Sequence, residues 1–280
     1  MTSTPIADAL RYRAGTSLAD IDTRSTPGFT GGKKDAEKAL PDLAPEMADL
    51  QEKLFAAGYT GSEQRLLLVL QGMDTSGKGG ILRHAVGLLD PGGMHLKSFK
   101  KPTPEELSHD FLWRVEKEVP GPGEIGIFDR SHYEDVLVVK VHSLTDATEI
   151  ERRYNAINEW EKRLVDEGTV IVKCMLHISP ETQKERLLAR LDDPTKQWKF
   201  KPEDIDERGF WSSYQDAYQT AVERCSTEAA PWHVVPSDRK WYRNWAIGQL
   251  LREHLAALEL DWPKPDYDLA EQRARLEGEG

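Results

Sequence analysis

The stretch that most constrains the fold is RLLLVLQ (65–71) followed directly by GMDTSGKGG (72–80). The first part is a short, continuous apolar run, which is typical of a strand buried on both faces of a parallel sheet. The second part fits G-x-x-x-x-G-K with Gly72, Gly77 and Lys78, and a helical pattern follows it. Backbone N–H groups at such a turn, together with a lysine ammonium, form an anion site. The stretch therefore predicts an α/β domain with a phosphate-binding loop.

Two positions in this loop depart from the usual pattern. The residue after the lysine is normally Ser or Thr, whose hydroxyl helps to hold Mg²⁺, but here it is Gly79. Asp74 places a carboxylate inside the loop, where an anionic ligand is expected. A carboxylate is a harder and more charged ligand for Mg²⁺ than a hydroxyl. We therefore predict that the loop brings part of a metal site with it, for Mg²⁺ or alternatively Mn²⁺, shared between two phosphate groups.

The rest of the chain alternates apolar runs with helical patterns. This alternation predicts a three-layer α/β/α domain with a central parallel sheet of about five strands, the fold class of P-loop kinases. Thr103 and Ser179, each followed by proline, are expected N-caps of two helices. The further strands are expected at 94–100, about 124–128, 169–178 and 232–237. The expected divisions are an irregular arm (1–33), a single domain (34–262) that begins with a helical extension (34–58) and carries a helical lid (about 182–209), and a polar tail (263–280).

A candidate metal ligand follows the third expected strand, in EIGIFDRSHYED. Asp129 ends the apolar run, as does the acid that helps to hold Mg²⁺ beside the loop in P-loop enzymes. Arg130 could clamp a phosphate oxygen or pair with a nearby acid. Glu134 comes one turn later, where it lies either near the metal or on a solvated helix face.

Cations gather in QKERLLARLDDPTKQWKFKPED, the expected lid. Arg186 and Arg190 are i, i+4 neighbours on one helix face. A mobile lid that carries arginine stabilises the transferring phosphoryl group in P-loop kinases, whereas an ordinary amphipathic helix would simply expose these charges. Other candidate phosphate-binding cations are Lys196 and Lys199 in the same segment, Arg83 in the helix after the loop, and Lys97, Lys100 and Lys101 after the second strand.

Charge and composition exclude several classes of protein. The 280 residues carry a formal net charge of −11, so nucleic-acid binding is not expected and any polyanion requires a local basic patch. There is no apolar run of membrane-spanning length, no signal-peptide pattern and no zinc-ligand spacing. The two cysteines, Cys174 and Cys225, form no disulfide framework, which suits the cytoplasm. Cys174 lies in an apolar run and is expected to be buried.

Taken together, the motifs resemble the polyphosphate kinase 2 family. The resemblance rests on GMDTSGKGG, FKKPTPEELSHDFLWR, GEIGIFDRSHYEDVLV, RLDDPTKQWKF and WHVVPSDRKWYRNW, which occur in the family's order over about residues 34–258. It implies a thymidylate-kinase-like P-loop fold, Mg²⁺ dependence, and homodimers or homotetramers. It also implies reversible phosphoryl transfer between inorganic polyphosphate and a nucleotide such as ADP, AMP or GDP.

The resemblance carries roles to matching residues. Asp74 and Asp129 would hold the metal, while Lys78 and Arg130 would contact phosphate. The lid cations would be Arg186, Arg190, Lys196 and Lys199, and Lys101 would lie on the acceptor side. We expect the loop to cradle the phosphates of the nucleotide, and Arg83 and the lid to follow the donor chain. Preference between AMP and ADP stays open. So do two alternatives, an ATP-dependent nucleotide kinase of the same fold and a non-enzymatic regulator that binds nucleotide or polyphosphate.

Overall fold

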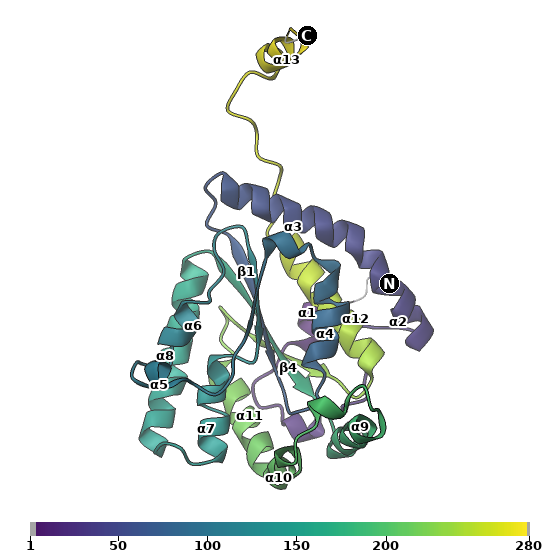
Figure 1. The fold of residues 1–280 in the computed structure, drawn as a ribbon, viewed down its shortest axis with the longest axis vertical. Coiled ribbons are helices and arrows are strands. Elements are labelled where there is room, and N and C mark those ends of the chain that lie inside the picture. Colours follow the sequence, from purple (N-terminus) through teal and green to yellow (C-terminus); the bar gives the residue numbers. More distant parts are fainter. Residues whose placement is uncertain (1–3, 279–280) are drawn as a thin grey trace.

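A computed structural model describes residues 4–278, and its centre is a sheet of five parallel strands (Figure 1). The strand order is β2-β3-β1-β4-β5, so the strand before the loop is the middle one. The strands are β1 (Arg65–Gln71), β2 (Met94–Ser98), β3 (Ile125–Asp129), β4 (Thr169–His177) and β5 (Trp232–Pro236). The predicted number, order along the chain and parallel direction of the strands are confirmed.

Helices cover both faces of the sheet, which confirms the three-layer prediction (Figure 1). The longer ones are α3 (Ala44–Tyr59), α8 (Ala147–Asp166), α9 (Pro180–Asp192), α11 (Trp211–Cys225), α12 (Lys240–Ala256) and α13 (Leu269–Glu277). The shorter ones are α1 (Ile6–Leu10), α2 (Lys33–Ala39), α4 (Lys78–His84), α5 (Pro104–Leu107), α6 (Trp113–Glu116), α7 (Val138–Val141) and α10 (Glu203–Gly209). Single turns of 3-10 helix include η1 (Leu18–Asp20), η2 (Pro41–Leu43), η3 (Val86–Leu88), η4 (Pro91–Gly93), η5 (His132–Asp135) and η6 (Gln197–Lys199).

The apolar run of β1 is explained by the two cores that it separates. Leu67 and Val69 belong to the core under α8 and α11, whereas Leu66, Leu68 and Leu70 belong to the core under α3, α4 and α12. Each of the five is fully buried. A strand with a core on both faces favours apolar side chains at successive positions, so its sequence shows no alternation of apolar and polar residues.

The helical extension, expected over 34–58 as one long helix or one interrupted by proline, is interrupted, because Pro41 begins η2 between α2 and α3. The two expected N-caps are confirmed: Thr103 Oγ1 accepts from the N–H of Glu106, and Ser179 Oγ accepts from that of Thr182. Cys174 is fully buried, as predicted.

The N-terminal arm is held against the domain. It contains α1 and η1, and the backbone N–H groups of Ile6 and Ala7 both donate to the Glu253 carboxylate at 2.9 Å. Further along, the Tyr242 hydroxyl donates to the carbonyl of Pro27 at 2.7 Å. The arm therefore has fixed contacts with α12, although its sequence shows no periodicity.

The C-terminal segment leaves the domain and forms α13 well away from it (Figure 1). Asp268 caps this helix by accepting from the N–H groups of Ala270 and Glu271. The tail was predicted only as polar, yet Trp262, Tyr267 and Leu269 expose half or more of their surface. Among residues 4–278, no helix combines the length and the apolar character needed to cross a bilayer.

Candidate active site

The phosphate-binding loop connects β1 to α4 and is shaped by its glycines. Gly77 is the N-cap of α4 and has a φ of 113°, a value that side chains other than glycine rarely adopt. Thr75 also has a positive φ of 64°, so the loop stores some backbone strain, which clusters at functional sites. Lys78 folds back over the loop, and its Nζ donates to the carbonyl of Gly72 at 2.7 Å. The Lys78 ammonium is therefore held beside Gly72, at the start of the loop.

A buried arginine that the sequence analysis did not single out supports the loop from below. Arg243 in α12 is 3% exposed, and its guanidinium donates to the carbonyl of Ser76 at 3.0 Å and to Oδ1 of Asn244 at 2.8 Å. Any side chain on Gly77 would overlap this guanidinium, and a Cβ on Gly80 would lie 2.6 Å from its Nη2. The glycines of the loop are thus required by the arginine as well as by the phosphate site.

Asp129 and Asp74 line one cavity at the carboxyl end of the sheet, as predicted for the metal ligands. Oδ2 of Asp129 accepts from Ser98 Oγ at 3.2 Å, but Oδ1 is buried and has no hydrogen-bond partner among the described residues. Arg130 pairs with Asp74 at 3.0 Å, so it does find a nearby acid. An orphaned carboxylate oxygen that faces a phosphate site suits a divalent cation.

The donor set fits Mg²⁺ shared with substrate. Within residues 4–278, no three His, Cys, Asp or Glu side chains converge into a metal cage. Mg²⁺ does not require one, because it is usually held by one or two carboxylates together with phosphate oxygens and water. Asp74 and Asp129 would be these carboxylates, and the ion would supply neutralisation of phosphate charge when bound.

Two ionisable groups beside the metal site have shifted pKa values. Burial, and next the positive charge of Arg130, lowers the pKa of Lys78, although Asp74, Asp129 and Glu134 oppose the shift. Burial raises the pKa of Glu134 despite the nearby Arg130 and Lys78. Glu134 thus lies beside Asp74 and Arg130 and not on a solvated helix face. Shifts of this kind are frequent where a site is arranged for chemistry.

Arg186 acts as a brace for the loop in this conformation. Its guanidinium donates to the carbonyls of Thr75 and Ser76 at 2.8 and 3.1 Å, and to those of Ser237 and Asp238 at 2.6 and 3.0 Å. This arginine connects the phosphate-binding loop to the end of β5. Hydrogen bonds to these four carbonyls restrict the movement of the Arg186 side chain.

Arg190 is more weakly held, one turn further along α9. It donates to the carbonyl of Lys199 at 3.3 Å and lies 3.6 Å from the Asp204 carboxylate. Lys199 places its ammonium 5.0 Å from the ring centre of Trp198 in η6. Arg83, Arg186, Arg190, Lys196 and Lys199 all line the same cavity of about 620 Å³, together with Gly77, Lys78, Gly79 and the two aspartates.

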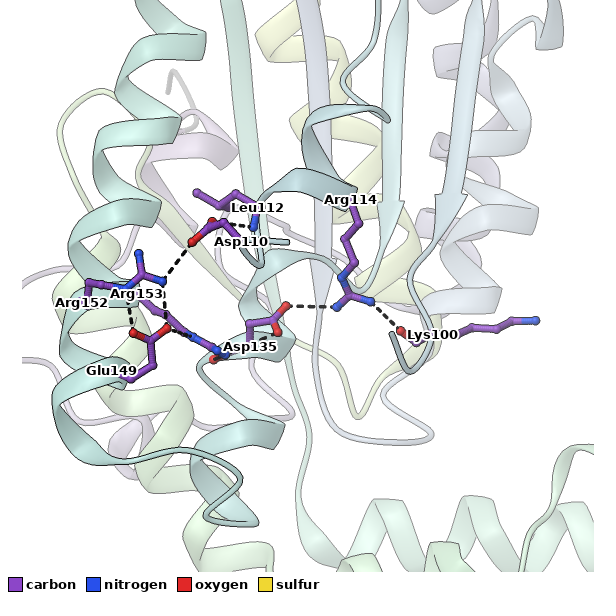
Figure 2. A network of polar contacts seen from close by, with 8 residues as sticks. All are labelled: Lys100, Asp110, Leu112, Arg114, Asp135, Glu149, Arg152 and Arg153. Atoms are coloured by element: carbon purple, nitrogen blue, oxygen red, sulfur yellow. Dashed lines mark hydrogen bonds and ion pairs between the residues drawn. The ribbon is translucent and has the colours of Figure 1, made fainter. Parts of the chain in front are cut away.

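The turn after β3 is anchored by a network of ion pairs and hydrogen bonds (Figure 2). Arg114 in α6 is 6% exposed and donates to the carbonyl of Lys100 at 2.9 Å and to Asp135 at 3.1 Å. Arg153 in α8 donates to the carbonyl of Asp135 at 3.0 Å. Figure 2 shows Arg114 between the segment after β2 and the turn after β3. The network therefore fixes the positions of the two chain segments that flank Asp129.

A second, smaller cavity meets the first at Asp74 and Arg130. Its volume is about 220 Å³, and Tyr214 and Tyr218 of α11 form part of its wall. The other lining residues are Gly72, Met73, Glu134, Leu137, Val138, Gln183, Asp204 and Glu207. The larger cavity is rich in cations, whereas the smaller one has aromatic, apolar and acidic walls.

The structure brings together most of the residues predicted from the sequence. Lys97 and Lys101 are exceptions, because neither lines one of the two cavities: Lys97 pairs with Glu118, and Lys101 is exposed. Their neighbour Lys100 lines the larger cavity. Sequence reasoning missed Arg243, Lys240, Tyr214 and Tyr218. For Arg243 a signal was present, since a helix with an arginine among apolar neighbours suggests a buried charge.

Comparison with known proteins identifies the family of this chain. The sequence model of polyphosphate kinase 2 (PPK2) matches residues 31–262, which include both cavities. The chain belongs to the polyphosphate kinase 2 family. The resemblance of the sequence motifs to this family is thereby confirmed.

Individual relatives of the PPK2 family are similar over nearly their whole length. The AMP/ADP-polyphosphate phosphotransferase of Meiothermus ruber is 45% identical, with 89% of this chain and 92% of the relative covered. The ADP-polyphosphate phosphotransferase of Rhodopseudomonas palustris is 37% identical, with 84% of each covered. The crystal structure of polyphosphate kinase 2 from Arthrobacter aurescens TC1 is 55% identical, covers 99% of this chain and 98% of its own, and superposes with a TM-score of 0.97.

Proposed function

We propose that this PPK2 enzyme transfers the terminal phosphoryl group of inorganic polyphosphate to AMP or ADP, with GDP as a further acceptor, in a reversible, Mg²⁺-dependent reaction. The observation that carries the proposal is the junction of two unlike cavities at Asp74 and Arg130. A long polyanion requires the cation-rich cavity. A nucleoside requires aromatic and apolar walls, which the smaller cavity has. The names of the similar relatives support both substrates.

This arrangement revises the placement of the nucleotide. From the sequence, the loop was expected to cradle the phosphates of the nucleotide. The lid cations and the loop now share one cavity, which favours the donor chain there. The nucleoside part of the acceptor would occupy the smaller cavity, beside Tyr214 and Tyr218. The terminal phosphate of the acceptor would reach Arg130 at the junction of the two cavities.

The residues of the chain act by alignment and by neutralising charge. Phosphoryl transfer needs little covalent help, because the acceptor is already an anionic phosphate oxygen. The bond between the terminal phosphorus and its bridging oxygen breaks, and the leaving chain keeps the electron pair. Asp74 and Asp129 would position Mg²⁺ between donor and acceptor, while Lys78, Arg130 and Arg190 would stabilise the charge on the transferring group.

One assay tests the function. The protein is mixed with polyphosphate, Mg²⁺ and either AMP or ADP, and formation of ADP or ATP is followed. We expect nucleotide phosphorylation that stops when EDTA removes the metal and resumes with Mg²⁺ or Mn²⁺. Turnover that requires ATP as the donor, with polyphosphate inert, would instead identify an ATP-dependent nucleotide kinase. Tight binding of either substrate without turnover would identify a regulator.

We also propose that the enzyme forms a homodimer or homotetramer. Tyr267 and Leu269 lie beside and at the start of α13 and expose half or more of their surface. The helix α13 lies well away from the domain (Figure 1), and Phe55 and Tyr59 of α3 are exposed as well. Exposed aromatic side chains on a projecting segment suit contact with a second copy. Light scattering of the full chain tests this, and a monomer at micromolar concentration would contradict it.

A further inference from the structure

A third cavity, of about 810 Å³, opens beside the active site. It shares Arg83, His84 and Lys240 with the cavity that holds the phosphate-binding loop, so the two are adjoining. Its walls come from the N-terminal arm, α2, α4 and the start of α12. We call it the arm groove, and neither the sequence motifs nor the reaction proposed above uses it.

The arm groove is lined by cations that lack acidic partners. Arg24, Arg83, Arg239 and Lys240 form no ion pair with any carboxylate in the part of the chain that the structure describes. By contrast, Lys33 at the rim lies 3.6 Å from Glu37. A set of unpaired cations in a protein of net charge −11 is uncommon and marks a place for an anionic ligand.

Asp238 is an acid in the wall of the groove, but it forms no ion pair within 4 Å of these cations, and its carboxylate oxygens accept from neutral groups instead. It accepts from Thr23 Oγ1 at 2.8 Å, and from the backbone N–H and hydroxyl of Ser179 at 3.0 and 2.9 Å. At Lys240, the groove also meets the positive charge of the neighbouring active-site cavity. Burial lowers the pKa of Lys240, and the charges of Arg186, Arg243 and Lys196 lower it further. A polyanion in the groove would relieve this repulsion.

The arm holds Arg24 at the wall of the groove. The carbonyl of Thr23 accepts from the N–H of Asp238 at 3.1 Å, next to the Thr23 side-chain contact described above. Beyond Arg24, the ring of Phe29 lies 4.5 Å from that of Trp245 in α12. Contacts on both sides of Arg24 therefore fix its backbone and reduce the entropy lost when its side chain binds a ligand.

The lining favours a linear polyanion over a nucleotide. A nucleobase would need a free aromatic face, and Trp241 is the aromatic residue among those that line the groove. The Arg239 guanidinium already lies 5.8 Å from the ring centre of Trp241. The groove thus offers four cations without acidic partners and one aromatic ring that an arginine already approaches, which suits a chain of repeated phosphates better than a nucleobase.

We propose that the arm groove binds phosphates of the polyphosphate chain that lie remote from its reacting end. This inference rests on the function proposed above. The chain would leave the active-site cavity past Arg83 and Lys240 and continue between Arg24 and Arg239. Donor affinity then depends on chain length, and the N-terminal arm contributes to substrate binding.

The test uses the double variant Arg24→Gln, Arg239→Gln and a ladder of inorganic chains from tripolyphosphate upward. Neither residue touches the reacting groups. We expect the KM for long chains to rise about three- to tenfold, as two lost charge contacts at a surface would give. The KM for the shortest chain that the wild-type protein uses, and kcat for every chain, should change by less than about twofold.

The matched control is Arg273→Gln, Arg275→Gln in α13, which removes the same charge far from the groove (Figure 1). Its KM should be unchanged at every chain length. An unchanged long-chain KM in the groove variant would overturn the inference, as would an equal rise for short and long chains. A wild-type protein that transfers from no chain at all would overturn the proposed function itself.

Discussion

At the scale of single residues, the loop carries two substitutions that compensate each other. Gly79 removes the hydroxyl that usually contacts Mg²⁺, and Asp74 supplies a carboxylate from the same loop. Asp74 also pairs with Arg130 at the junction of the two cavities. One side chain therefore connects the loop, the proposed metal and the proposed acceptor side.

Replacement of Asp74 by Asn tests this role, because it keeps the shape and removes the charge. We expect kcat to fall roughly 100-fold, corresponding to a loss of about 3 kcal/mol of transition-state stabilisation. Raising the Mg²⁺ concentration should recover part of the loss. A Cβ at Gly79 would meet no atom within 4 Å, so Asp74→Asn, Gly79→Ser should fold and should regain some Mg²⁺ affinity. Wild-type kcat in Asp74→Asn at limiting Mg²⁺ would contradict the metal role.

The lowered pKa of Lys78 predicts the alkaline limit of activity. Lys78 binds phosphate only in its charged form, and burial beside Arg130 makes it lose the proton below the ordinary lysine pKa of 10.5. In the free enzyme, kcat/KM for polyphosphate should therefore fall at a lower pH than an exposed lysine would give. The variant Lys78→Arg keeps its charge and should move this fall to higher pH. Identical pH profiles for the two proteins would exclude Lys78 as the titrating group.

At the scale of elements, α9 combines two arginines with different surroundings. From the sequence both were expected to act as mobile lid residues. Arg186 instead holds four carbonyls of the loop and of the segment after β5, whereas Arg190 has one long hydrogen bond and one ion pair. Spacing along a helix predicts a shared face but not which member of the face finds backbone partners.

Alanine variants should separate the two roles. Arg186→Ala leaves carbonyls without their donor, so we expect stability to fall by about 2–3 kcal/mol, with KM and kcat both impaired. Arg190→Ala should keep the melting temperature and lower kcat by roughly three orders of magnitude if it acts as an arginine finger. Thermal unfolding and single-turnover rates measure both effects. Equal stability of the two variants would contradict the assignment of Arg186 as a brace.

The strand β4, next to the middle strand of the sheet, contains a buried charge that its largely apolar sequence did not indicate. Lys173 is fully buried, and its Nζ donates to Glu161 of α8, to the Tyr133 hydroxyl at 2.8 Å and to the carbonyl of Cys225 at 2.6 Å. The apolar run VIVKCMLHI predicts a strand. Nothing in this run identifies the partner of its lysine, because the partner lies on another element. This partner depends on tertiary packing.

Removal of that charge should be costly. Lys173→Met leaves Glu161 buried without its cation, and we expect a loss of about 3–5 kcal/mol in urea unfolding. Lys162→Met in the same region removes an exposed lysine paired with Asp166 and should cost less than about 1 kcal/mol. The double variant Lys173→Met, Glu161→Leu should recover much of the loss. No recovery would mean that the two charges are not coupled.

At the scale of the whole molecule, the sequence predicts the layers and the strands better than the ends. Strands such as β1 are specified by local apolar runs and by the turns beside them. Pro41 marks the break in the N-terminal helical segment, but the contacts of the arm with Glu253 and Tyr242 join residues more than 200 positions apart. Arg243 is 167 positions along the chain from Ser76 in the loop that it supports. Such contacts follow from the fold and leave no periodic pattern.

The distribution of charge gives a prediction for the complete protein. A net charge of −11 by itself would repel polyphosphate, so added salt would speed association. The cations of the active-site cavity lie close to the bound chain and should outweigh the distant acids. We therefore expect kcat/KM for polyphosphate to fall as ionic strength rises from low to physiological values, while kcat stays nearly constant. A rise in kcat/KM with salt would show that the overall charge dominates.

The guanidinium of Arg243 beneath Gly77 and Gly80 restricts the order in which this protein can change during evolution. A side chain at Gly80 becomes possible only after Arg243 has been replaced by a smaller residue, because a Cβ there would lie 2.6 Å from the guanidinium. Replacement of Arg243 in turn removes a support of the loop. Each single step is harmful, and the combination is accessible only through an impaired intermediate. We therefore expect the loop and α12 to change together in evolution, although Gly80 and Arg243 are 163 positions apart in the sequence.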